Sequence, residues 1–414
     1  MTKRLYYDQP ELLEFDAVVE DVTASSPVSN RSSVVLRETA FYPTSGGQVH
    51  DTGWITIGRD EDERVRVSEV VEAEDGRIVH YLETPPMAAI AGASIHGSID
   101  RERRCDHMQQ HTGQHVLSAA FIELYQFPTV SFHMGADYCS IDLATESLSA
   151  AQVAEAERRA NEIVFENRPV RIRYVHREEA EKLGVRKLPP TEHVELRLIE
   201  VAEFDLSACG GTHVSSTGQI GSILLRKTEK TRQGMRVEFV CGARAVCAAR
   251  RDYTTLTEAA ALYSAQLADV PEMIRKGFEE SKLLRRQRED ALEQLAEALA
   301  VAAIQAAVHA RDTSSKIIVR TFADRDSNFA KLFAQKVTRA GEPAIALVAS
   351  SMNPPGLVFA QSPGGALDMG ALLKQVLSSV GGRGGGSRDF AQGGIPADCD
   401  IAQLLRQAAS TIEG

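Results

Sequence analysis

Two short motifs, far apart in the chain, constrain the fold more than any other feature of the sequence. The first, DHMQQHTGQHVLSAAF at residues 106–121, predicts a helix in which His107, His111 and His115 recur every four residues. Positions i and i+4 of a helix lie on one face, one turn apart, so two of these imidazoles can converge on a single ion.

The second motif is DLSACGGTHV at residues 205–214, in which Cys209 and His213 are four residues apart. The two glycines between them allow a tight turn that a side chain would forbid. With His111 and His115, this pair completes a set of three imidazoles and one thiolate, which suits zinc. We therefore predict a Zn²⁺ ion held by all four residues, which ties two distant parts of one domain together.

Neighbouring polar residues have less specific roles. His107 continues the histidine stripe, but the four ligands are complete without it, so we expect it to support a ligand or to pack in the core. We expect His133 to be structural. Asp205 either orients a ligand histidine or caps the loop, and the sequence favours neither role.

The predicted ion has two alternative roles. Four protein ligands close the coordination sphere, which is typical of structural zinc, whereas catalytic zinc keeps one position open. In the first alternative, a ligand histidine moves aside or the coordination expands, and the ion takes part in catalysis. In the second, which we favour, the ion orders the pocket and positions the substrate while other groups handle water.

The composition is that of a soluble globular protein, with 43% hydrophobic and 25% charged residues in a chain of 414. No apolar run approaches the ~20 residues that span a bilayer, and the N-terminus lacks the apolar core of a signal peptide. The six cysteines are scattered and never form CxxC, which is typical of reduced thiols. We therefore predict a cytoplasmic protein without a membrane segment.

The net charge of −11 is mild evidence against nucleic-acid binding, which favours a positive field. Local clusters of arginine and lysine nevertheless occur, although any single cluster is more often a solvated surface than a binding site. The clusters lie at residues 101–104, 168–177, 226–236 and 383–388.

The predicted fold class is α+β. Short β-branched runs, punctuated by Gly, Pro, Asn and Asp, predict a small β-barrel in residues 1–100. A mixture of helices and strands predicts a layered α+β domain in residues 101–250. Within that domain, residues 149–167 predict a helix with Ser149 as its N-cap.

The rest of the chain divides into a helical region and a small α/β module. Residues 251–312 are rich in Ala, Glu, Arg and Leu and predict a helical linker or hairpin, which Pro271 should divide in two. Strands alternate with helices in residues 313–414. Arginines interrupt the glycine-rich segment 381–396, so we expect a structured element that approaches phosphate or RNA rather than a flexible linker.

A loop within the first region, FYPTSGGQVHDTG at residues 41–53, is richer in Gly, Ser and Thr than a simple turn requires. This loop, followed by HTGQH, CGGTH and the glycine-rich end, resembles the long form of the AlaX alanyl-tRNA editing proteins. The order of motifs is equally similar to the editing and C-terminal halves of alanyl-tRNA synthetase without its aminoacylation domain. The resemblance covers nearly the whole chain.

The resemblance implies a deacylase that hydrolyses serine or glycine wrongly attached to tRNA(Ala), with no aminoacylation activity. It assigns the metal to the same four ligands. It also implies that Thr44 distinguishes serine from alanine and that Gln48 closes the same loop, so these two are the candidate catalytic residues. The glycine-rich end matches a tRNA-gripping module. Independently of the resemblance, the helical region and this glycine module are the candidate contacts of a homodimer, and the sequence leaves the oligomeric state open. The candidate tRNA contacts are Arg232, Arg236, Arg383 and Arg388.

The chemistry of such a reaction explains the polar loop. A pocket for alanine cannot strongly exclude a serine that only adds a hydroxyl, because that difference is worth ~1–3 kcal/mol. A second site that hydrogen-bonds the hydroxyl rejects the analogue without it by about 10⁴-fold, because a polar group is then left unpaired. Thr44 is the candidate for this group.

Two other functions compete with editing. A non-catalytic RNA-binding or assembly protein would use the zinc only to stabilise its fold, although such a scaffold has no use for the polar loop at residues 41–53. A zinc hydrolase for small esters or peptides is disfavoured, because the chain lacks HExxH and no glutamate follows His111.

Overall fold

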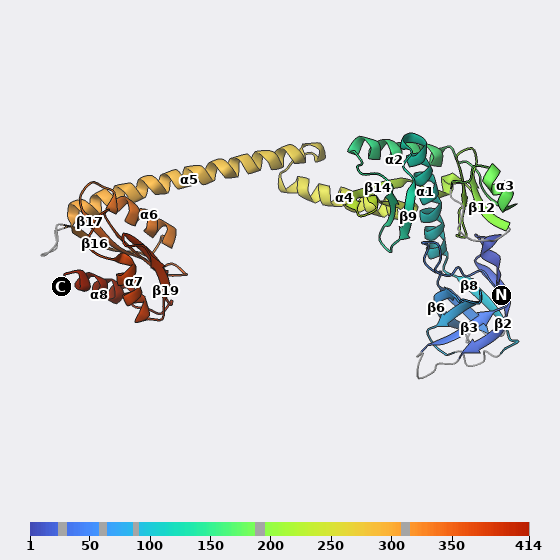
Figure 1. Cartoon of the computed structure of the whole chain (residues 1–414), viewed down its shortest axis with the longest axis horizontal. Helices are drawn as coiled ribbons and strands as arrows, with labels where there is room; N and C mark the ends of the chain where they lie inside the picture. Colours follow the sequence, from blue (N-terminus) through green and yellow to red (C-terminus); the bar gives the residue numbers. More distant parts are fainter. Residues whose placement is uncertain (24–30, 58–63, 86–90, 187–194, 308–314, 414) are drawn as a thin grey trace. The chain divides into compact units, whose positions relative to one another are not determined.

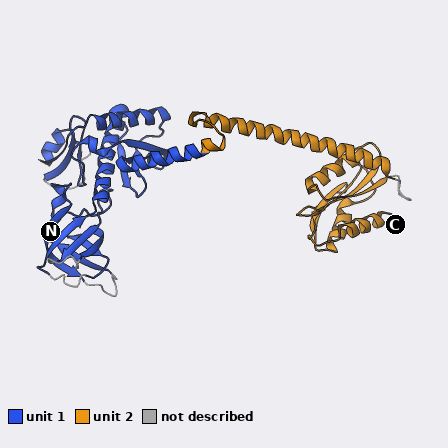
Figure 2. Ribbon diagram, turned by 180° about the vertical axis from the view of Figure 1, so that it is seen from behind, with its two compact units in different colours: residues 1–258 blue, residues 259–414 orange. Residues whose placement is uncertain are grey.

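The computed structural model divides into two compact units, Met1–Glu258 and Ala259–Gly414, which we describe separately (Figure 2). Among the helices of the described part, none is both long and apolar enough to cross a membrane. The structure describes residues 1–23, 31–57, 64–85, 91–186, 195–307 and 315–413.

Unit 1 begins with a closed antiparallel barrel in the order β2-β3-β7-β6-β5-β8, drawn in blue in Figure 1. Buried and more exposed residues alternate along strands β2, β5 and β8, so one face of each of these strands fills the interior, whereas β3 is buried throughout. A short parallel pair, β1 (Lys3–Arg4) and β4 (Glu38–Thr39), lies beside it. The barrel strands are β2 Glu14–Thr23, β3 Ser32–Leu36, β5 Gly53–Ile57, β6 Arg64–Glu72, β7 Ile78–Leu82 and β8 Ser94–Ile99.

The histidine motif lies on α1, a helix of 25 residues over Arg101–Tyr125 that follows β8 directly. Its residues 110–121 are all buried, because α2, the four-stranded sheet and the CGGTH loop surround this part of the helix. The helix ends at Gln126, which adopts the left-handed conformation with φ of 57°. Burial on every side explains why the helix lacks a clear apolar stripe.

An antiparallel sheet of four strands, in the order β14-β15-β10-β9, supports α1. The helix α2 (Ala150–Phe165) packs beside α1, and Ser149 caps it in a capping box with Gln152, as the sequence predicts. The strands are β9 Thr129–Met134, β10 Cys139–Leu143, β14 Ile223–Thr231 and β15 Gly234–Cys241.

A second small sheet, β11-β12-β13, delivers the CGGTH loop to α1. The loop begins directly after β13 (Asp205–Ala208), whose partner strand is β12 (Glu195–Val201). The outer strand β11 (Val170–His176) leads into the short helix α3 (Arg177–Lys182). A strand edge therefore fixes one half of the motif pair, and a buried helix fixes the other half.

A buried ion pair joins the barrel to α1. Arg104 and Asp51 are both fully buried, and the Arg104 guanidinium also donates hydrogen bonds to the carbonyl oxygens of Pro10 and Ala40, each at 2.6 Å. The Asp51 carboxylate accepts a further bond from the backbone amide of Tyr42 at 2.7 Å. Because these groups satisfy one another, the pair sets the position of the loop at residues 41–53 against the helix.

Two helices follow β15, the last strand of the four-stranded sheet. Helix α4 (Gly242–Leu262) begins in unit 1, and α5 (Val270–Ala306), a helix of 37 residues, lies in unit 2. The break between them lies before Pro271, which occupies the first turn of α5, where a missing amide hydrogen costs little. The helical character of this region is confirmed for the described residues. Residues 308–312 of the predicted linker lie outside the described residues. The homodimer contact stays a prediction.

The end of unit 2 is a three-layer α/β module around the sheet β16-β17-β18-β20-β19 (Figure 1). Alternate residues of the inner strand β17 face opposite layers, with α7 and α8 on one side and α5 and α6 on the other. The elements are β16 Lys316–Phe322, α6 Ser327–Thr338, β17 Ala344–Ser350, β18 Gly356–Gln361, α7 Met369–Ser378, β19 Arg383–Gly386, β20 Phe390–Gly394 and α8 Ile401–Glu413.

The glycine-rich segment forms the β19–β20 hairpin at the edge of this sheet. A Cβ atom at Gly386 would lie 2.2 Å from the carbonyl oxygen of Phe390, and one at Gly384 would lie 2.4 Å from the Cα atom of Gly393. The glycines are therefore required by the close approach of two strands. The segment is structured rather than a linker, and the predicted α+β class, with its barrel, helical region and small α/β module, is confirmed.

Replacing Arg104 by Met should destabilise the barrel and α1 by about 3–5 kcal/mol, because the Asp51 carboxylate is then buried without a positive charge to pair with it. The only tryptophan, Trp54, lies on barrel strand β5, so its fluorescence during urea unfolding reports this region. Arg158→Met removes an exposed ion pair on α2 and should leave the midpoint nearly unchanged. Equal midpoints for the two variants would contradict the role of the buried pair.

Candidate metal centre and substrate loop

The four predicted ligand residues converge on one point. His111 and His115 reach it from adjacent turns of α1, and Cys209 and His213 reach it from the loop after β13. One donor atom from each of the four lies within 4.8 Å of the others. The three histidines are buried and Cys209 is partly buried, so the centre is largely shielded from solvent.

Gln48 of the loop at residues 41–53, the predicted substrate loop, holds His111 in the required tautomer. The backbone amide of Thr212 donates to Gln48 Oε1 at 3.1 Å, and Gln48 Nε2 donates to Thr212 Oγ1 at 2.9 Å, which together fix the orientation of the amide. Gln48 Oε1 lies 2.8 Å from His111 Nδ1, which must therefore carry the proton. The lone pair of His111 Nε2, 3.4 Å from Cys209 Sγ, is left for a metal.

The other two histidines have similar support. His115 Nδ1 lies 3.2 Å from one carboxylate oxygen of Asp205. Arg186 Nε donates to the other oxygen of this carboxylate at 2.7 Å. Of the two roles left open for Asp205, the orientation of a histidine is therefore the one observed. His213 Nδ1 lies 3.1 Å from the hydroxyl of Thr112, one residue after His111 on α1. Each histidine directs its other nitrogen toward the common point.

The charge state of the cluster suits a cation. Burial opposes ionisation of Cys209, but His111 and His213 outweigh it and hold the pKa of this thiol well below its usual value. Burial lowers the pKa of His213 to about 3, and the nearby His111 acts in the same direction. Burial also opposes the charged form of His115, but hydrogen bonds to Asp205 and Cys209 outweigh it and raise the pKa of this histidine. A thiolate at Cys209 and a neutral imidazole at His213 are protonation states that bind zinc, so the donor set fits a zinc ion.

Gly211 is required by close packing at this centre. A Cβ atom there would lie 2.1 Å from His111 Cε1 and 3.0 Å from Gln48 Oε1. At the neighbouring Gly210 the nearest atom, the hydroxyl of Tyr7, would lie at 3.5 Å, which is an ordinary contact. The first glycine of the motif is therefore replaceable by alanine on steric grounds, and the second is not.

Thr44 lies on the exposed side of the loop that carries Gln48. Its hydroxyl accepts a hydrogen bond from the backbone amide of His50 at 3.1 Å and lies 3.0 Å from His50 Nδ1. His50 Nε2 donates to the carbonyl oxygen of Ser68 at 3.2 Å, so Nδ1 is an acceptor and the Thr44 hydroxyl is its donor. Burial, and then the charge of Arg103, lower the pKa of His50 and keep it neutral.

The remaining histidines of interest lie outside the cluster. His107 is buried one turn before His111 and does not belong to the ligand group, and its Nδ1 atom has no hydrogen-bond partner among the described residues. His133 is an exposed residue of β9. The supporting residues Thr112, Arg186 and His50 carried no sequence signal, since each contacts the site only through the tertiary fold.

The four candidate tRNA contacts are scattered over both units. Arg232 and Arg383 are exposed, the first in the β14–β15 turn and the second on β19. Arg236 forms a two-bond ion pair with Asp142 on the neighbouring strand, at 2.8 and 3.0 Å. Arg388 donates to loop carbonyl oxygens at 3.3 and 3.1 Å. Two of the four therefore have structural partners, and their binding of tRNA stays a prediction.

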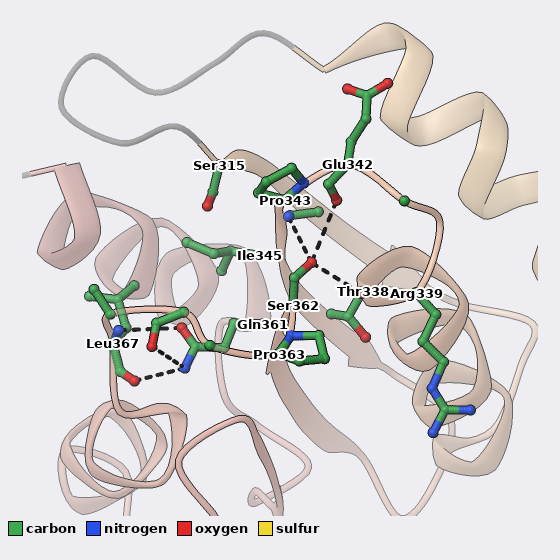
Figure 3. Close-up of a pocket in the computed structure, with 15 residues that line it drawn as sticks. Ser315, Thr338, Arg339, Glu342, Pro343, Ile345, Gln361, Ser362, Pro363 and Leu367 are labelled. Carbon is green, nitrogen blue, oxygen red and sulfur yellow. Dashed lines mark hydrogen bonds between the residues drawn. The ribbon is translucent and has the colours of Figure 1, made fainter.

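Unit 2 contains a cavity of about 810 Å³ at the ends of β17 and β18 (Figure 3). The polar side chains that line it hold the surrounding loops: the Ser362 hydroxyl accepts from the amide of Ala344, and Gln361 donates to the carbonyl oxygen of Leu367. Arg339 and Glu342 are the charged residues in its lining. This lining has no cluster of acids, bases or nucleophiles comparable to that on α1.

Comparison with known proteins places the chain in a family. A family model described as tRNA synthetases class II (A) matches residues 2–103, and the threonyl and alanyl tRNA synthetase second additional domain matches residues 196–237. The alanyl-tRNA editing protein AlaX-L of Pyrococcus horikoshii is 31% identical over 402 residues, which cover 96% of this chain and 95% of that protein. The chain belongs to the AlaX-L family.

Alanine--tRNA ligases are also related to this family member. The ligase of Pyrococcus furiosus is 34% identical over 307 residues, which are 72% of this chain but only 32% of the ligase. The chain thus spans about a third of that relative's length. The crystal structure of the C-Ala domain from Aquifex aeolicus alanyl-tRNA synthetase matches with a TM-score of 0.24 and 17% identity, over 26% of this chain and 98% of that chain.

Gly211→Ala should weaken metal binding by about 10- to 100-fold, because the added methyl group displaces His111 from its position beside Gln48. Competition with a chromophoric chelator, with Zn²⁺ as the probe, measures this affinity. Gly210→Ala is the matched control and should bind Zn²⁺ as the unaltered protein does. If both variants bind equally well, the close approach at Gly211 has no role in the centre.

Proposed function

We propose that this chain is a trans-editing hydrolase for tRNA(Ala) that carries the wrong amino acid, with serine and glycine as the candidate amino acids. The reaction is ester hydrolysis: the oxygen of water adds to the ester carbonyl carbon, the bond from that carbon to the ribose oxygen breaks, and free amino acid and tRNA leave. The observation that carries the proposal is the convergence of the four donors beside a loop that presents Thr44 and Gln48.

Family membership supports the proposal. The relative that covers nearly the whole chain is named an alanyl-tRNA editing protein. The relatives named as ligases are much longer than this chain, and the shared part includes the region of both motifs. An editing activity is therefore a better match to the extent of the similarity than a ligase activity.

We assign the metal site to zinc, held by His111, His115, Cys209 and His213. A bound zinc ion supplies a Lewis acid that orients the substrate and can polarise its carbonyl group. Gln48 acts through His111, whose tautomer and position it sets, and is therefore a positioning residue in this scheme. Because the four donors are all protein groups, we retain a positioning role for the ion rather than a direct catalytic one.

Thr44 gives the site its preference for serine. The Thr44 hydroxyl proton is used by His50 Nδ1, so the hydroxyl has a remaining lone pair and can accept a hydrogen bond from the hydroxyl of serine. Alanine cannot make this bond and leaves the lone pair unsatisfied. Burial and the charge of Arg103 lower the pKa of His50, which favours the neutral ring that the acceptor role of Thr44 requires.

Thr44→Val should lower the rate of serine release relative to alanine release by about 10- to 100-fold, because the hydrogen bond to the serine hydroxyl is lost. The measurement is deacylation of tRNA(Ala) charged with serine, glycine or alanine, side by side. Thr44→Ser retains the hydroxyl and should retain the preference. Glycine release should be unchanged, since glycine has no hydroxyl, and an equal loss with all three substrates would argue against selectivity by Thr44.

Removal of the metal should abolish serine release. Either a chelator or Cys209→Ala takes away the ion or one of its ligands, so seryl-tRNA(Ala) should remain charged, while readdition of Zn²⁺ to the chelated protein restores activity. Release that survives both treatments would remove the metal from the mechanism. If Cys209→Ala only lowers the melting temperature, and the unaltered protein hydrolyses no aminoacyl-tRNA, the chain is instead an RNA-binding protein with a structural zinc.

A further inference from the structure

Another cavity, of about 990 Å³, lies in unit 1, one helical turn from the metal centre. This second cavity has no role in the scheme above. Its wall includes the first two turns of α1, the end of β9 and the start of α4, together with Val49 of the substrate loop. His107, in this wall, precedes His111 by four residues, which places the two side chains about 5–6 Å apart along one helix face.

The cavity lining carries more positive than negative charge: its charged residues are Arg101, Arg103 and Arg244 against Glu102 and Asp106. The carboxylates that act on Arg103 are those of three aspartates, each of which already forms an ion pair with a different arginine. Arg103 therefore has no aspartate partner of its own, and the N-terminus of α1 adds a positive partial charge beside it. The three pairs are Arg104–Asp51, Arg66–Asp100 and Arg244–Asp106.

Arg103 is positioned by the substrate loop. Its Nε atom donates to the carbonyl oxygen of His50 at 2.8 Å, and among the described residues no partner is recorded for its two terminal amino groups. Partial burial lowers the pKa of Arg103, so the guanidinium has lost solvation without gaining an ionic partner. A fixed guanidinium fork of this kind suits the two oxygens of a phosphate.

His107 adds an unpartnered polar group to the same wall. The side chain is 2% exposed, and its Nδ1 atom has no hydrogen-bond partner within the part of the chain that the structure describes. Buried polar atoms are nearly always paired, so an orphan atom beside a cavity indicates a ligand. Burial lowers the pKa of His107 to about 4, and the neutral ring offers one donor and one acceptor near pH 7.

We propose that this cavity binds the 3′-terminal nucleotides of the acceptor strand, with a backbone phosphate at Arg103 and a polar group of a nucleoside at His107. The inference rests on the proposed function. An aminoacyl ester has no free carboxylate, so the anions nearest to its reactive bond are the phosphates of its own last nucleotides. The cavity volume lies in the range of small-ligand sites.

Charge distinguishes this cavity from the one on the other side of the centre. A cavity of about 410 Å³ borders His213, and the charged residues in its lining are Asp8 and Glu11. Carboxylates repel phosphate, so the nucleotide chain is expected to leave the metal centre on the His107 side. The aminoacyl group lies at the metal, and the acceptor strand follows the first turns of α1.

The test compares two uncharged tRNA(Ala) transcripts, one with its complete 3′ end and one without the last two nucleotides, by equilibrium binding to the full-length, Zn²⁺-loaded protein. The unaltered protein should bind the complete RNA more tightly. Arg103→Gln should reduce binding of the complete RNA by about 10- to 100-fold and leave the truncated RNA nearly unaffected. The salt dependence for the complete RNA should fall by about 0.7 in slope, the contribution of one single-stranded phosphate.

Matched variants separate the site from general charge and from folding. Arg158→Gln removes one exposed positive charge on α2 and should keep the preference for the complete end. His107→Asn tests the second contact without changing the charge and should also reduce the preference, and Zn²⁺ content and melting temperature show whether each variant is folded. If Arg103→Gln does not fold, the binding of the two RNAs by His107→Asn tests the proposal in its place.

Equal binding of the two RNAs by the unaltered protein overturns the proposal, as does an equal loss with both RNAs in Arg103→Gln. Because neither RNA is charged, the result does not depend on hydrolysis. A protein that prefers the complete end but releases no serine would disprove the editing function and keep the site. A protein that releases serine but binds the two RNAs equally would disprove the site and keep the editing function.

Discussion

The buried ion pair between Arg104 and Asp51 positions the barrel loop against α1, and both halves of the candidate site depend on that position. The same loop sends Gln48 to His111 and holds Arg103 through the carbonyl oxygen of His50. A shift of the loop would therefore move the support of a metal ligand and the cation of the second cavity together. The barrel thus acts as the platform of the site, although it contributes no metal ligand.

Helix α1 sets the spacing of the chemistry. Successive turns present Arg103 and His107 to the second cavity and His111 and His115 to the metal centre. Each turn advances about 5.4 Å, so a ligand that lies along the helix meets cation, imidazole and metal in order. Burial on every side over residues 110–121 keeps His111 and His115 in single positions, because close-packed interiors leave no alternative arrangement.

Local charge matters more than the overall charge in this protein. The chain carries a net charge of −11, which on its own argues against an RNA ligand. Near the start of α1, however, the aspartates around Arg103 are paired with other arginines, and the cavity lining keeps more arginines than acids. The cavity on the far side of His213 has the opposite sign. Such a division of charge around one centre gives a nucleic acid a single favourable approach.

The spacing of His111, His115, Cys209 and His213 was readable from the sequence, because helix geometry and a glycine turn leave few ways to use such motifs. The barrel, the helical region and the α/β module followed from periodicity and turn residues. The side chains that hydrogen-bond to the ligand histidines could not be predicted in this way. Gln48, Asp205 and Thr112 come from segments whose contact depends on sheet register and on packing across the whole unit. The surplus charge of Arg103 likewise exists only after folding has paired its neighbours, because an ion pair is a property of distances that a linear sequence does not contain.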